Sequence, residues 1–119
     1  MSYDIWLNDP VTGEQLHSES KHDLHGGTYA LGGTTQLWIN ITYNYAPYFY
    51  EHIDEEEGIR SLYGKVAATT IPILQEVIGK LGDDVDDNYW EPTEGNAKRA
   101  LTQLLALAYL RPDGVWDGD

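Results

Sequence analysis

Two short acidic stretches carry the side chains best suited to binding a basic partner. Each holds four carboxylates within at most five residues: Asp54, Glu55, Glu56 and Glu57 in the first, and Asp83, Asp84, Asp86 and Asp87 in the second. Tyr89 and Trp90 follow the second stretch, and aromatic side chains of this kind are common anchors at protein interfaces. We therefore expect these residues to contact a partner protein through a basic groove on that partner.

The chain as a whole is acidic. Its 119 residues include 7 basic and 20 acidic side chains, for a formal net charge of −13. A surface of this sign repels phosphate backbones and acidic membranes, so we expect no direct contact with nucleic acid or membrane. It favours the positive groove of a nucleic-acid-binding protein, and the alternative is that the acidity serves only solubility. Without a leader or a long apolar run, the chain is expected to be cytoplasmic.

A second group of residues points to a different ligand. Tyrosines crowd residues 42–50, and some of the few cations could reach them; the residues concerned are Tyr43, Tyr45, Tyr48, Arg60, Lys98 and Arg111. If they converge, a ring would stack on a base and an arginine would clamp a phosphate, as in a sponge that sequesters a nucleotide messenger. A chain this small offers little concavity, so such a pocket would lie between subunits of a homo-oligomer. The alternative is that the cations are scattered and paired with carboxylates.

No pattern specifies a metal, a cofactor or a catalytic centre. His17, His22 and His25 lie near Asp23, but their spacing is not that of a helical ligand pair, and the chain has no cysteine. Residues 84–88 begin like a calcium loop, but tyrosine then stands where that loop needs glycine. Gly-Gly-Thr triplets at 26–28 and 32–34 are typical of tight turns, the alternative being an anion-binding nest. Because no recognisable catalytic motif is present either, we expect a non-enzymatic protein.

The elements that position these residues follow from hydrophobic periodicity. Residues 36–43 alternate, with aliphatic side chains on one face and Trp38 on the other, which is typical of a half-buried strand. Because Trp38 makes the second face partly apolar as well, we expect this strand to be central in its sheet. Residues 3–7 predict a first strand, and residues 14–18 predict the return strand of a hairpin.

Later in the chain the apolar period changes from about two to about 3.6 residues. It predicts a helix over residues 70–81, with Thr70 as N-cap and Gly82 as a left-handed terminal residue, and a longer helix over 94–110 capped by Thr93. Strands followed by helices predict a single α+β domain, with an antiparallel sheet in the N-terminal half packed on two longer C-terminal helices. The helical side chains expected in its core are Leu74, Ile78, Leu101 and Leu104.

Several long segments are similar to a known group of proteins. GGTYALGGTTQLWINITYNY, GIRSLYG and YWEPTEGNAKRALTQLLALAYLRPDGVWDGD, with the N-terminal MSYDIWLNDPVTGE, resemble small proteins of phages and prophages of Gram-positive and gut bacteria. The resemblance covers most of the chain and implies a viral or mobile-element origin, but no particular activity. Many accessory phage proteins of this size counter host defences. By association with that class of proteins, we expect an inhibitor of a bacterial antiviral defence system, acting in the cytoplasm of the infected or lysogenic host.

Overall fold

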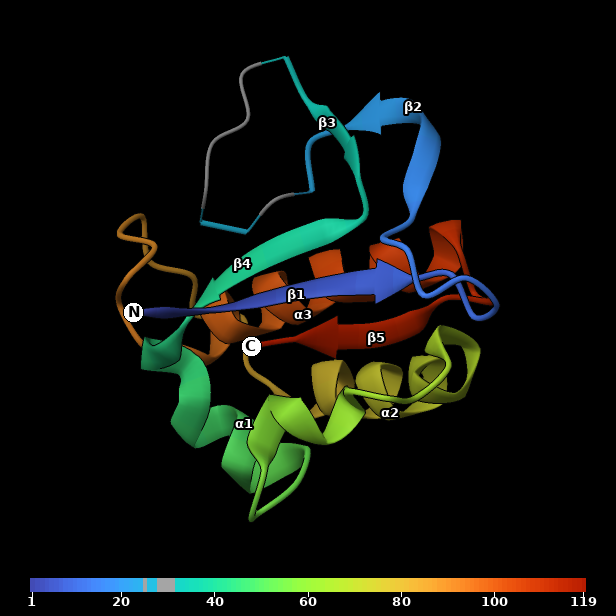
Figure 1. Cartoon of the computed structure of the whole chain (residues 1–119). Helices are drawn as coiled ribbons and strands as arrows, with labels where there is room; N and C mark the ends of the chain where they lie inside the picture. Colours follow the sequence, from blue (N-terminus) through green and yellow to red (C-terminus); the bar gives the residue numbers. More distant parts are fainter. Residues whose placement is uncertain (25, 28–31) are drawn as a thin grey trace.

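Three antiparallel strands form a sheet that packs on two long helices (Figure 1). A computed structural model of the chain describes residues 1–24, 26–27 and 32–119. The elements are β1 (Ser2–Asn8), β2 (His17–His22), β3 (Thr34–Gln36), β4 (Trp38–Thr42), the 3-10 helix η1 (Tyr43–Tyr45), α1 (Ala46–His52), the 3-10 helix η2 (Gly58–Leu62), α2 (Ala67–Lys80), α3 (Glu94–Leu110) and β5 (Val115–Gly118). The predicted α+β architecture is confirmed, and a C-terminal strand completes the sheet.

The central strand of this sheet is β1, not the strand predicted to be central. The strand order is β4-β1-β5, so β4 lies at an edge. The alternating run 36–43 is divided at Leu37, whose main chain accepts from Leu7 N at 3.0 Å and donates to Leu16 O at 3.2 Å. Before this point the chain pairs with β2, and after it with β1. The period of two predicted the strand over 38–42, but not that Gln36 would belong to β3 and Tyr43 to η1. The pattern contains no information about which neighbour each half would find.

The predicted return strand 14–18 forms only a short hairpin contact. A single bridge joins Asn8 and Gln15, and Leu16 N donates to Leu7 O at 2.8 Å. The chain then leaves the sheet as β2, which pairs with β3 in a separate two-stranded ribbon standing above the sheet in Figure 1. β2 has no buried residue, which explains why its polar sequence showed no hydrophobic period.

The core lies between one face of the sheet and the helices. The buried side chains on this inner face are Tyr3, Ile5 and Leu7 of β1, Ile39 and Ile41 of β4, and Trp116 of β5. Leu74, Leu101 and Leu104 are buried against them as predicted, whereas Ile78 is only half-buried at the margin of the core.

Helix α3 has the predicted bounds, and Thr93 Oγ1 accepts from Asn96 N at 3.1 Å as its cap. Helix α2 differs from the prediction at both ends. It begins a turn earlier, so Thr70 lies inside the helix, where its hydroxyl donates to Ala67 O at 2.7 Å and accepts from Trp116 Nε1 at 2.9 Å. Gly82 does not have positive φ, because α2 ends with Leu81 in an extended conformation. Within the described ranges, no helix combines the length and hydrophobicity needed to cross a bilayer.

Candidate functional site

The segment that joins α2 to α3, residues 81–93, contains the second acidic stretch and is called here the acidic loop. It forms no helix or strand, yet one buried side chain of α3 binds it at three points. Asn96 is 1% exposed; its Oδ1 accepts from Asp86 N at 3.0 Å, and its Nδ2 donates to Asn88 O at 3.0 Å and Glu91 O at 3.1 Å. Because main-chain groups of the loop are bonded into the first turn of α3, the loop has a defined shape.

Residues of the segment 42–48 bind the acidic loop at three further points. Tyr45 donates its hydroxyl to Tyr89 O, and Tyr48 donates to Pro92 O at 2.7 Å. Tyr89 in turn accepts from Thr42 N at 2.9 Å. Burial raises the pKa of the Tyr45 and Tyr89 hydroxyls above their usual value, because it favours the neutral form of each. Tyr45 is fully buried, and in this structure it positions the loop rather than presenting a surface on which a base could stack.

The loop displays one large aromatic side chain among carboxylates. Trp90 is 51% exposed, and its ring stands edge-on to Tyr89 with 5.0 Å between the ring centroids. The exposed aspartates differ in their roles: Asp84 accepts from Gly95 N at 3.1 Å, and Asp83 pairs with Lys98 at 2.7 Å. The loop therefore combines an anchored Tyr89, a protruding Trp90 and exposed negative charge.

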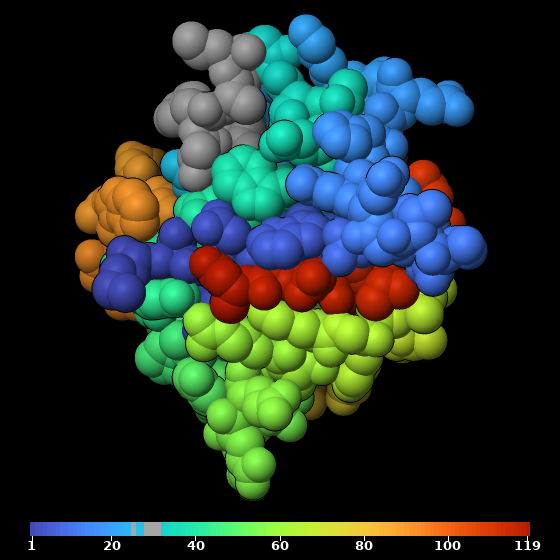
Figure 2. Space-filling view, in the orientation of Figure 1, coloured from blue at the N-terminus to red at the C-terminus, as the bar shows by residue number. Residues whose placement is uncertain are grey.

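The other acidic stretch forms a separate projection. Asp54 accepts from Glu56 N at 3.0 Å and Glu57 N at 2.7 Å, which closes the turn between α1 and η2 and leaves the three glutamates exposed. Figure 2 shows this turn as the light green tip at the bottom, apart from the orange acidic loop at the left. The two stretches therefore do not merge into one patch.

The three cations proposed to hold a phosphate lie in three different places. Arg60 stacks over Tyr3 and Tyr43, with its Cζ 4.9 Å and 5.6 Å from the two ring centroids, and its Nη2 donates to the Tyr43 hydroxyl at 3.2 Å. Lys98 pairs with the acidic loop, as described above. Arg111 forms a two-point contact with Asp113 at 2.9 and 2.8 Å, about 20 Å along α3 from Lys98. Of the predicted pocket, the structure brings together only Arg60 and Tyr43.

His17 and His22 lie at the two ends of β2, on the exposed ribbon. His17 Nδ1 is 3.1 Å from Thr35 Oγ1, and His22 Nε2 is 2.6 Å from Gln36 O. His25 lies outside the described residues, as does Thr28 of the first glycine triplet. Among the described residues, no cluster of three or more histidine or acidic side chains could hold a metal ion. The expected tight turns are present at the glycine positions, where Gly26, Gly32 and Gly33 have positive φ.

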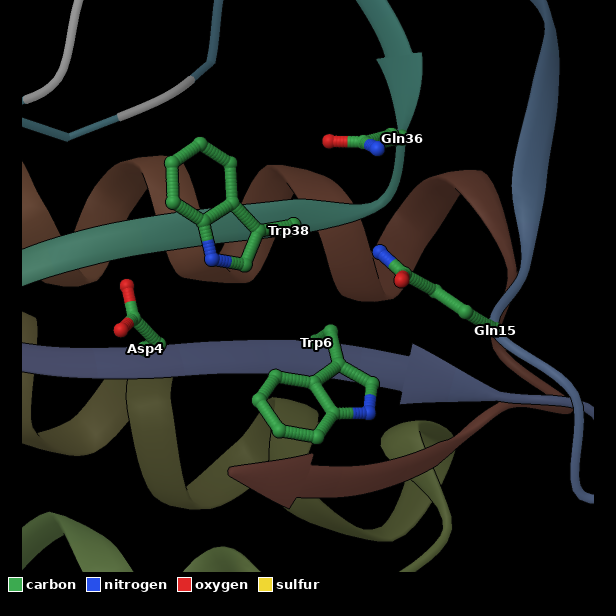
Figure 3. Close-up of a pocket in the computed structure, with 5 residues that line it drawn as sticks. All are labelled: Asp4, Trp6, Gln15, Gln36 and Trp38. Carbon is green, nitrogen blue, oxygen red and sulfur yellow. The ribbon is translucent and has the colours of Figure 1, made fainter. Parts of the chain in front are cut away.

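A second candidate site, not predicted from the sequence, lies on the sheet face opposite the helices. Trp6 and Trp38 lie directly across from each other on β1 and β4, and they line an open hollow of about 380 Å³ with Asp4, Gln15 and Gln36 (Figure 3). The signal was present, because both tryptophans occupy the outward position in strands whose alternate residues are aliphatic.

No family model, curated protein or solved structure matches the chain.

Proposed function

We propose that the chain is a non-enzymatic accessory binding protein that inhibits a bacterial antiviral defence protein. It acts by placing its acidic surface on the partner's basic nucleic-acid-binding cleft, and its origin is a phage or prophage. The observation that supports this function best is the acidic loop, which is fixed by Asn96 and presents Trp90 at 51% exposure among aspartates. The turn at Glu55, Glu56 and Glu57 contributes negative charge at a second place.

Three physical effects favour this function. The net charge of −13 accelerates encounter with a basic surface, an effect that salt weakens. Trp90 supplies the large, rigid contact area that dominates many interfaces. The hydrogen bonds of Asn96 and Tyr45 already order the loop, so less conformational entropy is lost when it binds. A disordered acidic segment would have only the first of these advantages.

Two charge-matched variants test the role of the acidic loop. One carries Asp83→Asn, Asp86→Asn and Asp87→Asn; the other carries Glu55→Gln, Glu56→Gln and Glu57→Gln, so each removes three negative charges from the net −13. Asparagine retains an acceptor oxygen, so the loop should keep its shape. A protein captured from bacterial lysate by the wild-type chain is purified, and its affinity for each variant is measured at low and high salt.

The loop variant should bind more weakly by about tenfold or more at low salt, and the turn variant by much less. Equal losses in the two variants would show that net charge alone attracts the partner and would remove the loop from the proposal. Unchanged binding by both would refute the proposed role of the acidic surface. Denaturation curves of the two variants provide the control that both are folded.

A nucleotide sponge, the alternative ligand-binding function, has weaker support. Of its residues, Arg60 and Tyr43 are in contact, but Arg60 also donates its Nε to the main-chain oxygen of Asp119 at 2.8 Å. Lys98 and Arg111 each face their own aspartate, so a phosphate would have to displace existing partners. Calorimetry against cyclic nucleotides and ADP-ribose derivatives distinguishes the two functions, because only a sponge gives saturable heat and releases its ligand intact on denaturation.

A further inference from the structure

The sheet has a face that the helices do not cover, called here the outer face. Pairing of the strands places Trp38, Trp6 and Asp117 in one row across β4, β1 and β5. In the next row Asn40 lies beside Asp4. In the view of Figure 1 β4 and β1 lie in front of α3, and in Figure 2 the three strands form the middle of the visible surface. Two indoles and two carboxylates therefore share one side of the sheet.

The carboxylates of the outer face have only neutral partners in the part of the chain that the structure describes. Asp4 Oδ1 accepts from Asn40 Nδ2 at 2.9 Å, and Asp117 Oδ2 accepts from Asn8 Nδ2 at 3.1 Å. Neither aspartate belongs to an ion pair among these residues, although four such pairs occur elsewhere. The outer face therefore carries negative charge that no described side chain neutralises.

The tryptophans of the outer face are arranged as a platform. Both are half-buried, and Figure 3 shows their rings lying across the strands with their faces turned outward and Asp4 beside them. The amides of Gln15 and Gln36 border the other end of the hollow. A flat ligand could thus stack on an indole and reach a carboxylate at the same time.

Guanidinium is the chemical group that matches these features. It is planar and permanently charged, it stacks on aromatic faces, and its fork of N–H donors binds a carboxylate through two bonds. Tryptophan is the best aromatic partner for a cation. Lysine has a compact, strongly hydrated ammonium group and gains less from the platform. A second copy of this chain is disfavoured as the occupant, because it would bring Asp4 and Asp117 against the same two carboxylates.

We propose that the outer face is a docking site for arginine side chains of a basic protein segment, which stack on Trp6 or Trp38 and pair with Asp4. The proposal rests on the proposed function, since it specifies the chemistry of the partner. It also adds a second contact surface, distinct from the acidic loop. The partner would be engaged by arginine recognition on the sheet and by Trp90 on the loop.

Intrinsic tryptophan fluorescence, titrated with an oligo-arginine peptide and an oligo-lysine peptide of equal length, tests this site without the natural partner. The wild-type chain should bind the arginine peptide about fivefold or more tightly than the lysine peptide. Asp4→Asn retains the acceptor for Asn40, and Trp38→Ala removes one platform; each should abolish the preference for arginine. Tyr109→Ala is the matched control, since it removes an exposed aromatic ring of α3 and should leave the preference unchanged.

Equal affinity for the two peptides would overturn the proposal, because it would show that net charge alone attracts them. Loss of the preference in a further variant, Trp90→Ala, instead of in Trp38→Ala would place arginine recognition on the loop and overturn it as well. Saturable binding of a neutral glucan oligosaccharide, lost in Trp38→Ala, would identify a sugar site instead. The peptide titration can fail while the charge-matched loop variants still behave as proposed, and the reverse also holds, so the two proposals fail independently.

Discussion

Substituting Asn96 by alanine should release the acidic loop while leaving most of the fold in place. Asn96 is 1% exposed, and all three side-chain hydrogen bonds described above end on the main chain of the loop. Alanine removes both the acceptor for Asp86 N and the donors for Asn88 O and Glu91 O. The loop groups lie near the surface and can regain water, so the free energy lost is that of net hydrogen bonds rather than of buried unpaired groups.

The expected destabilisation follows from these three bonds. Each net hydrogen bond contributes about 0.5–1.5 kcal/mol, so together they contribute about 1.5–4.5 kcal/mol. Alanine is the better helix former, by about 0.5 kcal/mol, and offsets part of the loss. We expect Asn96→Ala to lower the free energy of unfolding by about 1–4 kcal/mol. In addition, the 81–93 segment should become accessible to protease before global unfolding.

Urea denaturation measures the stability loss, and limited proteolysis with a protease that cleaves beside aromatic residues measures opening at Trp90. Thr93→Ala is the matched control, because it removes the cap of α3 at about 1 kcal/mol but none of the three bonds made by the Asn96 side chain. Only Asn96→Ala should open the loop. If its stability falls by less than about 0.5 kcal/mol and the loop stays protected, the claim that Asn96 fixes the loop is wrong.

Three further predictions concern the fold. Burial raises the pKa of Tyr45. A group whose pKa is raised in the folded state contributes its full stabilisation to the protein below its unfolded pKa, about 10, and progressively less as the pH rises above that value. The free energy of unfolding should therefore fall less steeply with rising pH in Tyr45→Phe than in the wild-type chain. Gly95→Ala should destabilise because the added Cβ would lie 2.5 Å from Val85 N, whereas Gly79→Ala, with nothing within 4 Å, should stabilise α2 by about 0.5–1 kcal/mol. Leu104→Ala should cost about 2–5 kcal/mol in urea denaturation, since Leu104 is fully buried.

Each of these predictions has an outcome that contradicts it. An unchanged alkaline profile in Tyr45→Phe, followed by circular dichroism across pH 9–12, would show that this hydroxyl is not buried in solution. Equal stabilisation by Gly95→Ala and Gly79→Ala would mean that the loop does not approach α3 closely. A loss below about 1 kcal/mol at Leu104 would place it outside the core.

The elements were predictable because their signals are local. The period of two over 36–43 and the cap at Thr93 both depend on neighbours within a few residues. The first predicted the strand that the structure has at 38–42, and the second predicted the start of α3. The position of β4 at the edge depends on β5, which lies more than 70 residues further along the chain. Thr70 has the composition of a cap, but its partner is Trp116, a contact that only the tertiary fold creates.

The acidic stretches were predictable as charged segments, but their architecture was not. Nothing in the local sequence indicates that Asn96 would fix residues 86–91, or that Tyr45 and Tyr48 would bind the loop rather than a base. The outer face illustrates the same difficulty. Trp6 and Trp38 are 32 residues apart, and only the β1–β4 register places them side by side.

The most direct test of the central claim is competition for the captured partner. A labelled nucleic acid is bound to that protein, and the wild-type chain or Trp90→Ala is added while the bound label is followed by fluorescence anisotropy. We expect complete displacement by the wild-type chain, whereas Trp90→Ala should require about thirtyfold more protein, because Trp90 acts as an interface hot spot. A ternary complex, in which the chain binds while the nucleic acid stays in place, would show that the chain does not occupy the nucleic-acid-binding cleft.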